Sequence, residues 1–270
     1  MTSDKLAVLI DADNAQASII QELLSEVSRY GTASVKRIYG DWTTDKLKAW
    51  KSVLNRMAIQ PIQQFAYTNG KNSTDSALII DAMDLLHDGN LNGFCLVSSD
   101  SDFTRLATRI REAGLVVYGF GEKKTPQPFV AACDKFVYTE ILRTLQVTIP
   151  ETSPVAPIST SPERLNKEPS ETHAAGGDDL EKKLSIAVSA CALDNGWATL
   201  AQVGSMLLKN DSSFDPRNYG FPKLGELVRK QHYLEVKEIQ SVKGSPIAHL
   251  HVRLKTCVPP DGKTQARTTA

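Results

Sequence analysis

The stretch Ala7-Val8-Leu9-Ile10-Asp11-Ala12-Asp13-Asn14 decides the fold of the first half of this chain. Its continuous apolar run is typical of a strand that is buried on both faces of a parallel sheet. A second stretch, Leu96-Val97-Ser98-Ser99-Asp100-Ser101-Asp102-Phe103, has the same form. Ligands of open parallel sheets bind beyond the carboxyl ends of the strands, so the polar residues that close each run are the first candidates for function.

Apolar runs alternate with helical periodicity over residues 1–145. The expected strands cover residues 6–10, 34–39, 59–67, 94–97, 115–120 and, at an edge, 135–138, and the expected helices cover 14–30, 45–57, 73–86 and 103–113. We expect Asn14 to cap the first helix and Pro61 to weaken the start of the third strand. This order predicts an α/β domain whose central parallel sheet is covered by helices on both faces.

Three acidic clusters lie at positions where the predicted sheet would bring them together. Asp11 and Asp13 follow the first strand, Asp75 lies at the start of the third helix, and Asp100 and Asp102 follow the fourth strand. We expect the first and fourth strands to be neighbours, with the start of the third helix nearby. Carboxylates packed together repel one another, and a hard cation with oxygen ligands, such as Mg²⁺, removes that cost. The alternative is that each residue only caps a helix, and the spacing alone leaves both interpretations open.

Three residues are secondary candidates for the same site. Asp13 and Ser99 lie within the clusters. Asp81 belongs with Asp84 and Asp88 to one stripe of the third helix, which is typical of a solvated face. Asp81 is kept as a candidate because it lies nearest to the start of that helix.

Composition and charge indicate an ordinary globular protein with a second, more basic part. The chain has a net charge of zero and a hydrophobic fraction of 41%. Residues 180–257 hold 11 basic and 7 acidic residues, a balance that permits nucleic-acid contact. We expect a first domain at 1–147, a flexible Pro/Ser/Glu-rich linker at 148–178, a second domain at 179–257 and a disordered tail at 258–270. Isolated cysteines and the lack of a long apolar run favour a cytoplasmic protein that does not enter membranes.

The motifs of the first domain resemble the NYN domain, and most closely the LabA-like branch of the PIN-like superfamily. The matching residues are those of the two opening stretches, Lys71-Asn72-Ser73-Thr74-Asp75 and Gly119-Phe120-Gly121. The resemblance implies a three-layer α/β fold and metal-dependent endonucleolytic cleavage of RNA with Mg²⁺ or Mn²⁺. It makes Asp11, Asp75, Asp100 and Asp102 the metal ligands, with Asn14 as a catalytic partner of Asp11. Lys71 is a candidate phosphate contact, although the interpretation as an exposed loop lysine is favoured.

The second domain resembles the OST-HTH/LOTUS domain. The likeness rests on Trp197-Ala198-Thr199-Leu200 and above all on Phe214-Asp215-Pro216-Arg217-Asn218-Tyr219-Gly220-Phe221. Helices expected at 180–193, 200–208 and 222–230, with strands at 233–236 and 248–254 around a turn at 243–245, make a winged helix. The resemblance implies RNA binding, including structured and G-rich RNA. The candidate RNA contacts are Arg217, Tyr219, Lys223, Arg229 and Lys230, and core packing is the favoured interpretation of Tyr219.

Three functions are compatible with these observations. The first is a metal-dependent endoribonuclease whose second domain captures RNA. The second is an RNA-binding or regulatory protein that has the metal-binding fold but no turnover. The third is a phosphatase of the haloacid dehalogenase type, in which Asp11 of the Asp11-x-Asp13 pair would be the nucleophile. The sequence leaves a homo-oligomer open.

Overall fold

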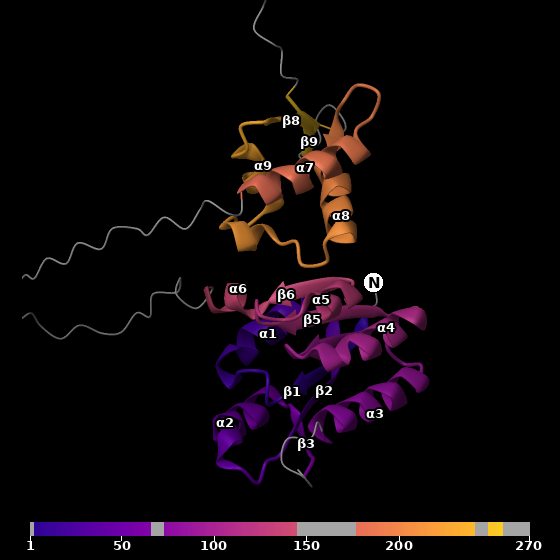
Figure 1. Cartoon of the computed structure of the whole chain (residues 1–270), viewed down its shortest axis with the longest axis vertical. Coiled ribbons are helices and arrows are strands. Elements are labelled where there is room, and N and C mark those ends of the chain that lie inside the picture. Colours follow the sequence, from indigo (N-terminus) through magenta and orange to yellow (C-terminus); the bar gives the residue numbers. More distant parts are fainter. Residues whose placement is uncertain (1–2, 66–72, 145–176, 241–247, 256–270) are drawn as a thin grey trace, which may run out of the picture. The chain divides into compact units, whose positions relative to one another are not determined.

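A computed structural model describes residues 3–65, 73–144, 177–240 and 248–255 of the chain (Figure 1). The chain forms two compact units. The first contains the elements from β1 to α6, and the second contains most of the elements from α7 onward. The expected linker, as far as residue 176, and the expected tail lie outside the described residues.

The first unit is built on a six-stranded parallel sheet with the strand order β3-β2-β1-β4-β5-β6. The strands are β1 (Lys5–Asp11), β2 (Thr32–Gly40), β3 (Gln60–Gln63), β4 (Gly93–Val97), β5 (Val116–Gly121) and β6 (Lys135–Tyr138). β1 pairs in parallel with β2 on one side and with β4 on the other. The expected pairing of the first and fourth strands is therefore confirmed, and the carboxyl ends of β1 and β4 meet where the strand order reverses.

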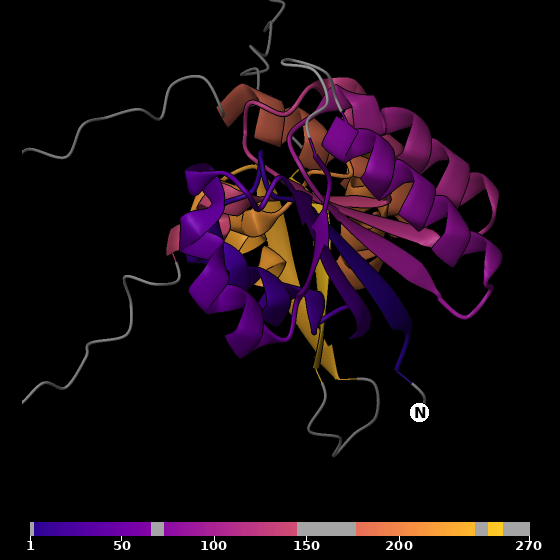
Figure 2. The ribbon, with the colours of Figure 1, turned by 90° about the horizontal axis from the view of Figure 1, so that it is seen from below.

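Helices cover both faces of this sheet (Figure 2). One face carries α1 (Ile20–Val27), α2 (Lys48–Met57) and α6 (Thr139–Thr144), and the other carries α3 (Ser73–His87), α4 (Thr104–Glu112) and α5 (Gln127–Ala132). Side chains alternate along β1, so Val8 and Ile10 join the core under the first layer while Leu9 joins the core under the second. β1 therefore contributes to both cores. Burial of each such side chain contributes about 1.5–3 kcal/mol to stability.

Some local features of this unit differ from the sequence expectations. Asn14 does not cap the first helix, because a 3-10 turn at Ala17–Ile19 precedes α1 and its N-cap position is Gln16. β3 ends at Gln63, well before the expected end of that strand. Periodicity does not predict α5 or α6, because each has six residues and fewer than two turns cannot display a helical pattern.

The second unit combines helices with a small antiparallel sheet of order β7-β9-β8. Its elements are α7 (Gly177–Cys191), β7 (Ala198–Thr199), α8 (Leu200–Asn210), α9 (Leu224–Arg229), β8 (Leu234–Gln240) and β9 (Ala248–Leu254). The three helices and the strand pair of a winged helix are confirmed, and β7 adds a short third strand. α7 begins inside the segment assigned to the linker, and Pro222 precedes α9, whose N-cap is Lys223. The expected turn at 243–245 lies outside the described residues.

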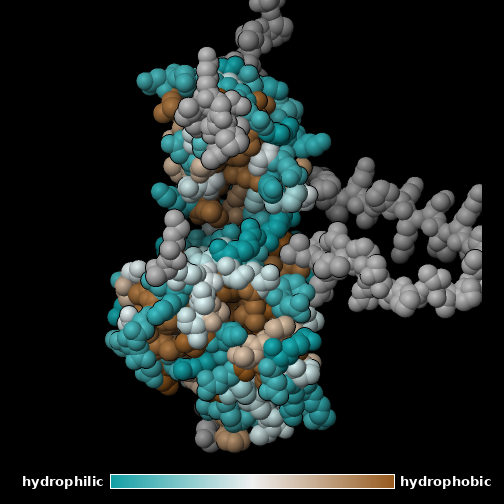
Figure 3. All heavy atoms as spheres, turned by 180° about the vertical axis from the view of Figure 1, so that it is seen from behind, coloured by the Kyte–Doolittle hydropathy of each residue, from teal (hydrophilic) through white to brown (hydrophobic). Residues whose placement is uncertain are grey.

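On the face that Figure 3 shows, both units display hydrophilic residues interrupted by hydrophobic patches. Large hydrophobic side chains that remain exposed include Ile80 in the first unit and Ile186 in the second. Within the described ranges, no helix has the length and apolar character needed to cross a membrane.

Candidate metal centre

Asp11 ends β1 and is almost fully buried, with 1% of its surface exposed. Its Oδ1 atom accepts a hydrogen bond of 3.0 Å from the backbone amide of Asp13. Its Oδ2 atom accepts one of 2.7 Å from the side-chain amide of Asn14 and one of 2.8 Å from the hydroxyl of Ser98. These three donors stabilise the buried carboxylate, and they occupy three of its roughly four acceptor sites.

Ser98 connects the ends of the two central strands. It follows β4, whose pairing with β1 extends to Val97 opposite Ile10. Its hydroxyl oxygen, which donates to Asp11, also accepts a 3.1 Å hydrogen bond from the backbone amide of Asp100. The neighbouring strand β5 ends at Gly121, where an added Cβ would lie 2.5 Å from the carbonyl oxygen of Ser98. Only glycine leaves room for Ser98 at this position.

Asp75, Asp100 and Asp102 come together beside this point. Asp75 lies in the first turn of α3, and the other two residues belong to the 3-10 turn that precedes α4. Asp100 is the N-cap of that turn and accepts a 3.0 Å hydrogen bond from the backbone amide of Asp102, as its expected capping role requires. One carboxylate oxygen from each residue lies within 4.8 Å of the others. We call these three residues the acidic triad.

The acidic triad has the electrostatics of a cation site. The pKa of Asp75 is raised to about 6, first by burial and then by the negative charges of Asp11, Asp100, Asp102 and Asp13. The pKa of Asp13 is also raised, by burial and by Asp11, although Lys46 opposes this change. Carboxylates that repel one another in this way are relieved by a divalent cation with oxygen ligands. The donor set fits Mg²⁺ or Mn²⁺, since the triad contains only hard oxygen ligands.

A model of the NYN domain matches residues 5–142, just over half of the chain. The chain belongs to the NYN domain family. A model of the OST-HTH/LOTUS domain matches residues 179–245, so the two domains follow each other in the order expected from the sequence. A comparison with curated proteins gives no match.

Three solved structures resemble parts of this NYN protein. A crystal structure of a protein of unknown function from Vibrio parahaemolyticus is 19% identical, covers 50% of this chain and 93% of its own, and has a TM-score of 0.43. A solution structure of an uncharacterized protein from Nitrosomonas europaea is 32% identical, with coverages of 37% and 92% and a TM-score of 0.27. A solution structure of residues 175–257 of a protein from Chromobacterium violaceum is 37% identical, with coverages of 32% and 91% and a TM-score of 0.25.

The other site candidates of the NYN domain differ in whether they contact the acidic residues. Asn14 contacts Asp11 directly. Asp13 lies outside the triad and influences the site through its charge. The hydroxyl of Ser99 accepts a hydrogen bond of 2.9 Å from the backbone amide of Glu122 rather than contacting an acid of the cluster. Lys71 lies outside the described residues.

Asp81 has partners that explain its presence without a metal. One of its carboxylate oxygens accepts a hydrogen bond from the guanidinium group of Arg37, and the other accepts one from the hydroxyl of Tyr39. Tyr39 is fully buried, and its pKa is raised first by burial and then by the hydrogen bond to Asp81. The stripe pattern predicts a solvated position for Asp81. The structure shows instead that its carboxylate binds two side chains of β2.

The candidate RNA contacts of the OST-HTH domain differ in exposure and in whether they pair with a carboxylate. Lys223 and Lys230 are exposed at the two ends of α9, and neither forms a salt bridge with another described residue. Arg229 is exposed but pairs with Glu238. Arg217 is half-buried and donates hydrogen bonds of 2.9 and 2.7 Å to both carboxylate oxygens of Asp215, and Tyr219 is also half-buried.

Ser98 is the residue of the site that sequence reasoning missed. The sequence pattern names Ser99 as a candidate, but the hydroxyl of Ser98 is the one that reaches Asp11. The pairing of β1 with β4 is the observation that identifies Ser98, because the first residue beyond β4 lies next to the last residue of β1. That register is a tertiary property, so adjacent serines cannot be distinguished from their order in the chain.

Proposed function

We propose that this protein is a metal-dependent endoribonuclease in which the NYN domain hydrolyses RNA and the OST-HTH domain captures it. The observation that carries the proposal is the acidic triad at the end of the central strands of an NYN domain. NYN domains are typically nucleases, and the presence of an OST-HTH/LOTUS domain suggests RNA binding. Both domains therefore point to the same substrate class.

In this proposal Asp75, Asp100 and Asp102 hold the cation, Mg²⁺ or Mn²⁺. When bound, such an ion supplies Lewis acidity that neutralises charge on the attacked phosphate and lowers the pKa of water. Asp11 has one acceptor site left beyond its three hydrogen bonds, and we assign that site to the ion or to a water molecule of its shell. Asn14 and Ser98 hold the Asp11 carboxylate in one orientation.

The OST-HTH domain is proposed to add RNA affinity to the near-neutral NYN domain. Residues 1–150 carry 16 basic and 17 acidic residues, whereas residues 180–257 carry an excess of four basic residues. RNA affinity depends strongly on contacts between basic side chains and phosphates. A tether between the domains would raise the concentration of captured RNA near the acidic triad. Lys223 and Lys230 are the contacts we favour, since Arg217 and Arg229 already pair with carboxylates.

The haloacid dehalogenase alternative is not favoured by the environment of Asp11. A nucleophilic aspartate must present a carboxylate oxygen to the substrate, but Asp11 is 1% exposed and both of its oxygens accept hydrogen bonds. A small phosphoester offered to the protein tests this directly, and we expect no turnover.

The decisive experiment incubates the full chain with labelled single-stranded, hairpin and G-rich RNAs in Mn²⁺, Mg²⁺ or EDTA. Asp100→Asn is compared with Asp84→Asn, a matched change at an exposed position of α3 outside the triad. We expect internal cuts that require the metal, persist in Asp84→Asn and disappear in Asp100→Asn. RNA retention without cleavage by a folded, metal-loaded wild type would favour the non-catalytic RNA-binding function.

A further inference from the structure

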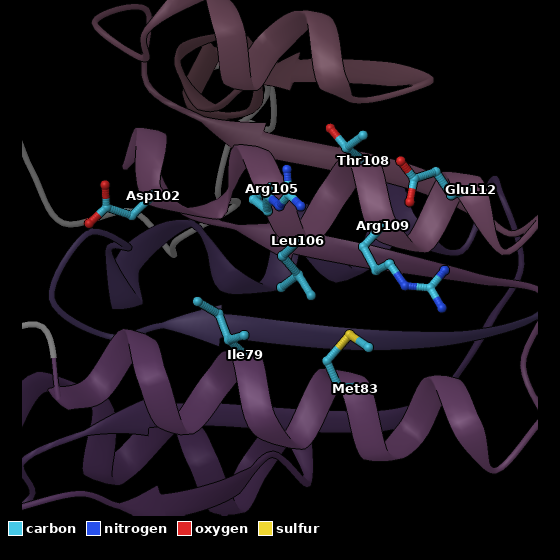
Figure 4. A pocket seen from close by; sticks show the side chains of 8 residues that line it. All are labelled: Ile79, Met83, Asp102, Arg105, Leu106, Thr108, Arg109 and Glu112. Atoms are coloured by element: carbon cyan, nitrogen blue, oxygen red, sulfur yellow. The ribbon is translucent and has the colours of Figure 1, made fainter.

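A groove between α3 and α4 extends to Asp102, one residue of the acidic triad (Figure 4). It encloses about 210 Å³, and Asp102 is one of its lining residues. Ile79 and Met83 project into it from α3, and Leu106 projects from α4 opposite them. The same residue therefore belongs to the triad and to the wall of the groove.

The exposed rim of the groove along α4 carries two arginines and one acid, Glu112, at the end away from Asp102. Arg105 and Arg109 both line it and both are exposed. They are four residues apart, so they lie on one face of the helix as neighbours. Neither forms a salt bridge with a described residue, whereas Arg111 on another face of α4 pairs with Asp134 at 3.0 Å. Two guanidinium groups that have no carboxylate partner among the described residues, next to an acidic cation site, are suited to the phosphates of a bound chain.

The floor of the groove is apolar and matches the size of one aromatic ring. Leu106 is buried, and Ile79 and Met83 are half-buried. A cavity of about 150 Å³ lined by aliphatic side chains is sufficient for benzene, so about 210 Å³ accepts a planar base. A methionine sulfur in the floor adds a favourable contact to an aromatic ring.

We propose that this groove binds single-stranded RNA, with one unstacked base on the floor formed by Ile79, Met83 and Leu106 and with phosphates paired to Arg105 and Arg109. A base inside a duplex would first have to leave its stack, which costs free energy, so the groove selects unpaired RNA. The inference rests on the proposed function and specifies its substrate class. It predicts that the nucleotide beside the cleaved bond is unpaired.

The first test removes the basic rim. Binding of a fluorescent single-stranded RNA of about 12 nucleotides is measured by anisotropy in EDTA, where the proposed reaction does not proceed. We expect Arg105→Ala combined with Arg109→Ala to raise the Kd by about tenfold for each arginine removed. The slope of log Kd against log salt should fall by about 0.7 for each lost phosphate contact. The control is Arg56→Ala on α2, an exposed arginine on the opposite face of the sheet.

The second test fills the floor. Met83→Trp occupies the groove, whereas Ile80→Trp adds the same ring at an exposed position of α3 that does not line it. We expect Met83→Trp alone to weaken binding of the single-stranded RNA about tenfold and to slow its cleavage in Mn²⁺. Neither tryptophan should change the weaker binding of a duplex of the same sequence.

The outcomes separate this inference from the proposed function. Normal single-strand binding by both groove variants, with cleavage like that of the controls, overturns the groove and leaves the nuclease intact. If the groove variants lose affinity equally for single-stranded and duplex RNA, the proposed single-strand preference is overturned. If the wild type cleaves no RNA, the proposed function fails, and the binding measurements in EDTA still decide the groove.

Discussion

The hydroxyl of Ser98 donates a 2.8 Å hydrogen bond to the Oδ2 atom of Asp11, and both residues are buried at the adjoining ends of β4 and β1. The same hydroxyl oxygen accepts from the backbone amide of Asp100. One side chain thus connects the acid of the first strand with the segment that carries Asp100 and Asp102. A shared hydrogen-bond network therefore joins the ends of the two central strands to Asp100 and Asp102 of the acidic triad.

Ser98→Ala should weaken metal binding without removing any proposed ligand. Loss of a residue that orients ligands typically costs 10–100-fold in metal affinity or activity, and we expect at least about tenfold for Mn²⁺ measured by calorimetry. Ser101→Ala, at an exposed position of the following turn, is the control and should bind Mn²⁺ as the wild type does. An unchanged Mn²⁺ affinity in Ser98→Ala would show that the orientation of Asp11 does not matter to the ion.

Burial of Asp75, together with repulsion from its acidic neighbours, predicts an unusual pH dependence of stability in the metal-free protein. The folded state holds the Asp75 proton more tightly than the unfolded state, because its pKa rises from 3.8 to about 6. Stability should therefore fall as the pH rises between about 4 and 6, and it should stay lower above that window.

Asp75→Asn should abolish the fall in stability between about pH 4 and 6. In EDTA at neutral pH we expect the variant to be more stable than the wild type by about 1 kcal/mol after allowance for solvent screening, or roughly 2–4 °C in Tm. Mn²⁺ should stabilise only the wild type. Thermal unfolding with and without metal checks both statements, and a variant less stable than the wild type in EDTA would contradict them.

Asp81→Asn should affect stability and leave the metal site unchanged. The amide cannot accept from both Arg37 and Tyr39, so one donor beside the buried ring of Tyr39 loses its partner. We expect a loss of about 2 kcal/mol in the free energy of unfolding, measured with urea. Asp84→Asn on the same helix should cost less than about 0.5 kcal/mol. Weaker Mn²⁺ binding by folded Asp81→Asn would instead return Asp81 to the list of ligands.

Lys223→Ala combined with Lys230→Ala should weaken RNA binding by the full chain. Both lysines are exposed beside α9 and lack salt bridges to described residues, so each is available to a phosphate. We expect the slope of log Kd against log salt to fall by about 0.7 per lysine for single-stranded RNA. Lys209→Ala, at the exposed end of α8, is the matched control. A salt slope equal to that of the control would show that these two lysines do not contact RNA phosphates.

The sequence determined the architecture because the relevant patterns are local. The apolar run of β1, the helical periodicity of α2 to α4 and the turn residues between them predict a parallel sheet with helices on both faces. The acids at the ends of β1 and β4 follow from the same reasoning, since parallel strands present their carboxyl ends at one edge. Short elements such as α5 were not determined in this way, because six residues carry too little pattern.

Only the tertiary structure decided which side chains meet. Asp75 is far from Asp100 in the chain, and their approach depends on how α3 packs on the sheet. The choice of Ser98 over Ser99, and the capture of Asp81 by Arg37 and Tyr39, depend on strand register and helix rotation. A shift of one residue sends each of these side chains to another face, and the sequence pattern around it would look the same. Local periodicity selects the elements, but packing between elements sets the distances on which metal binding depends.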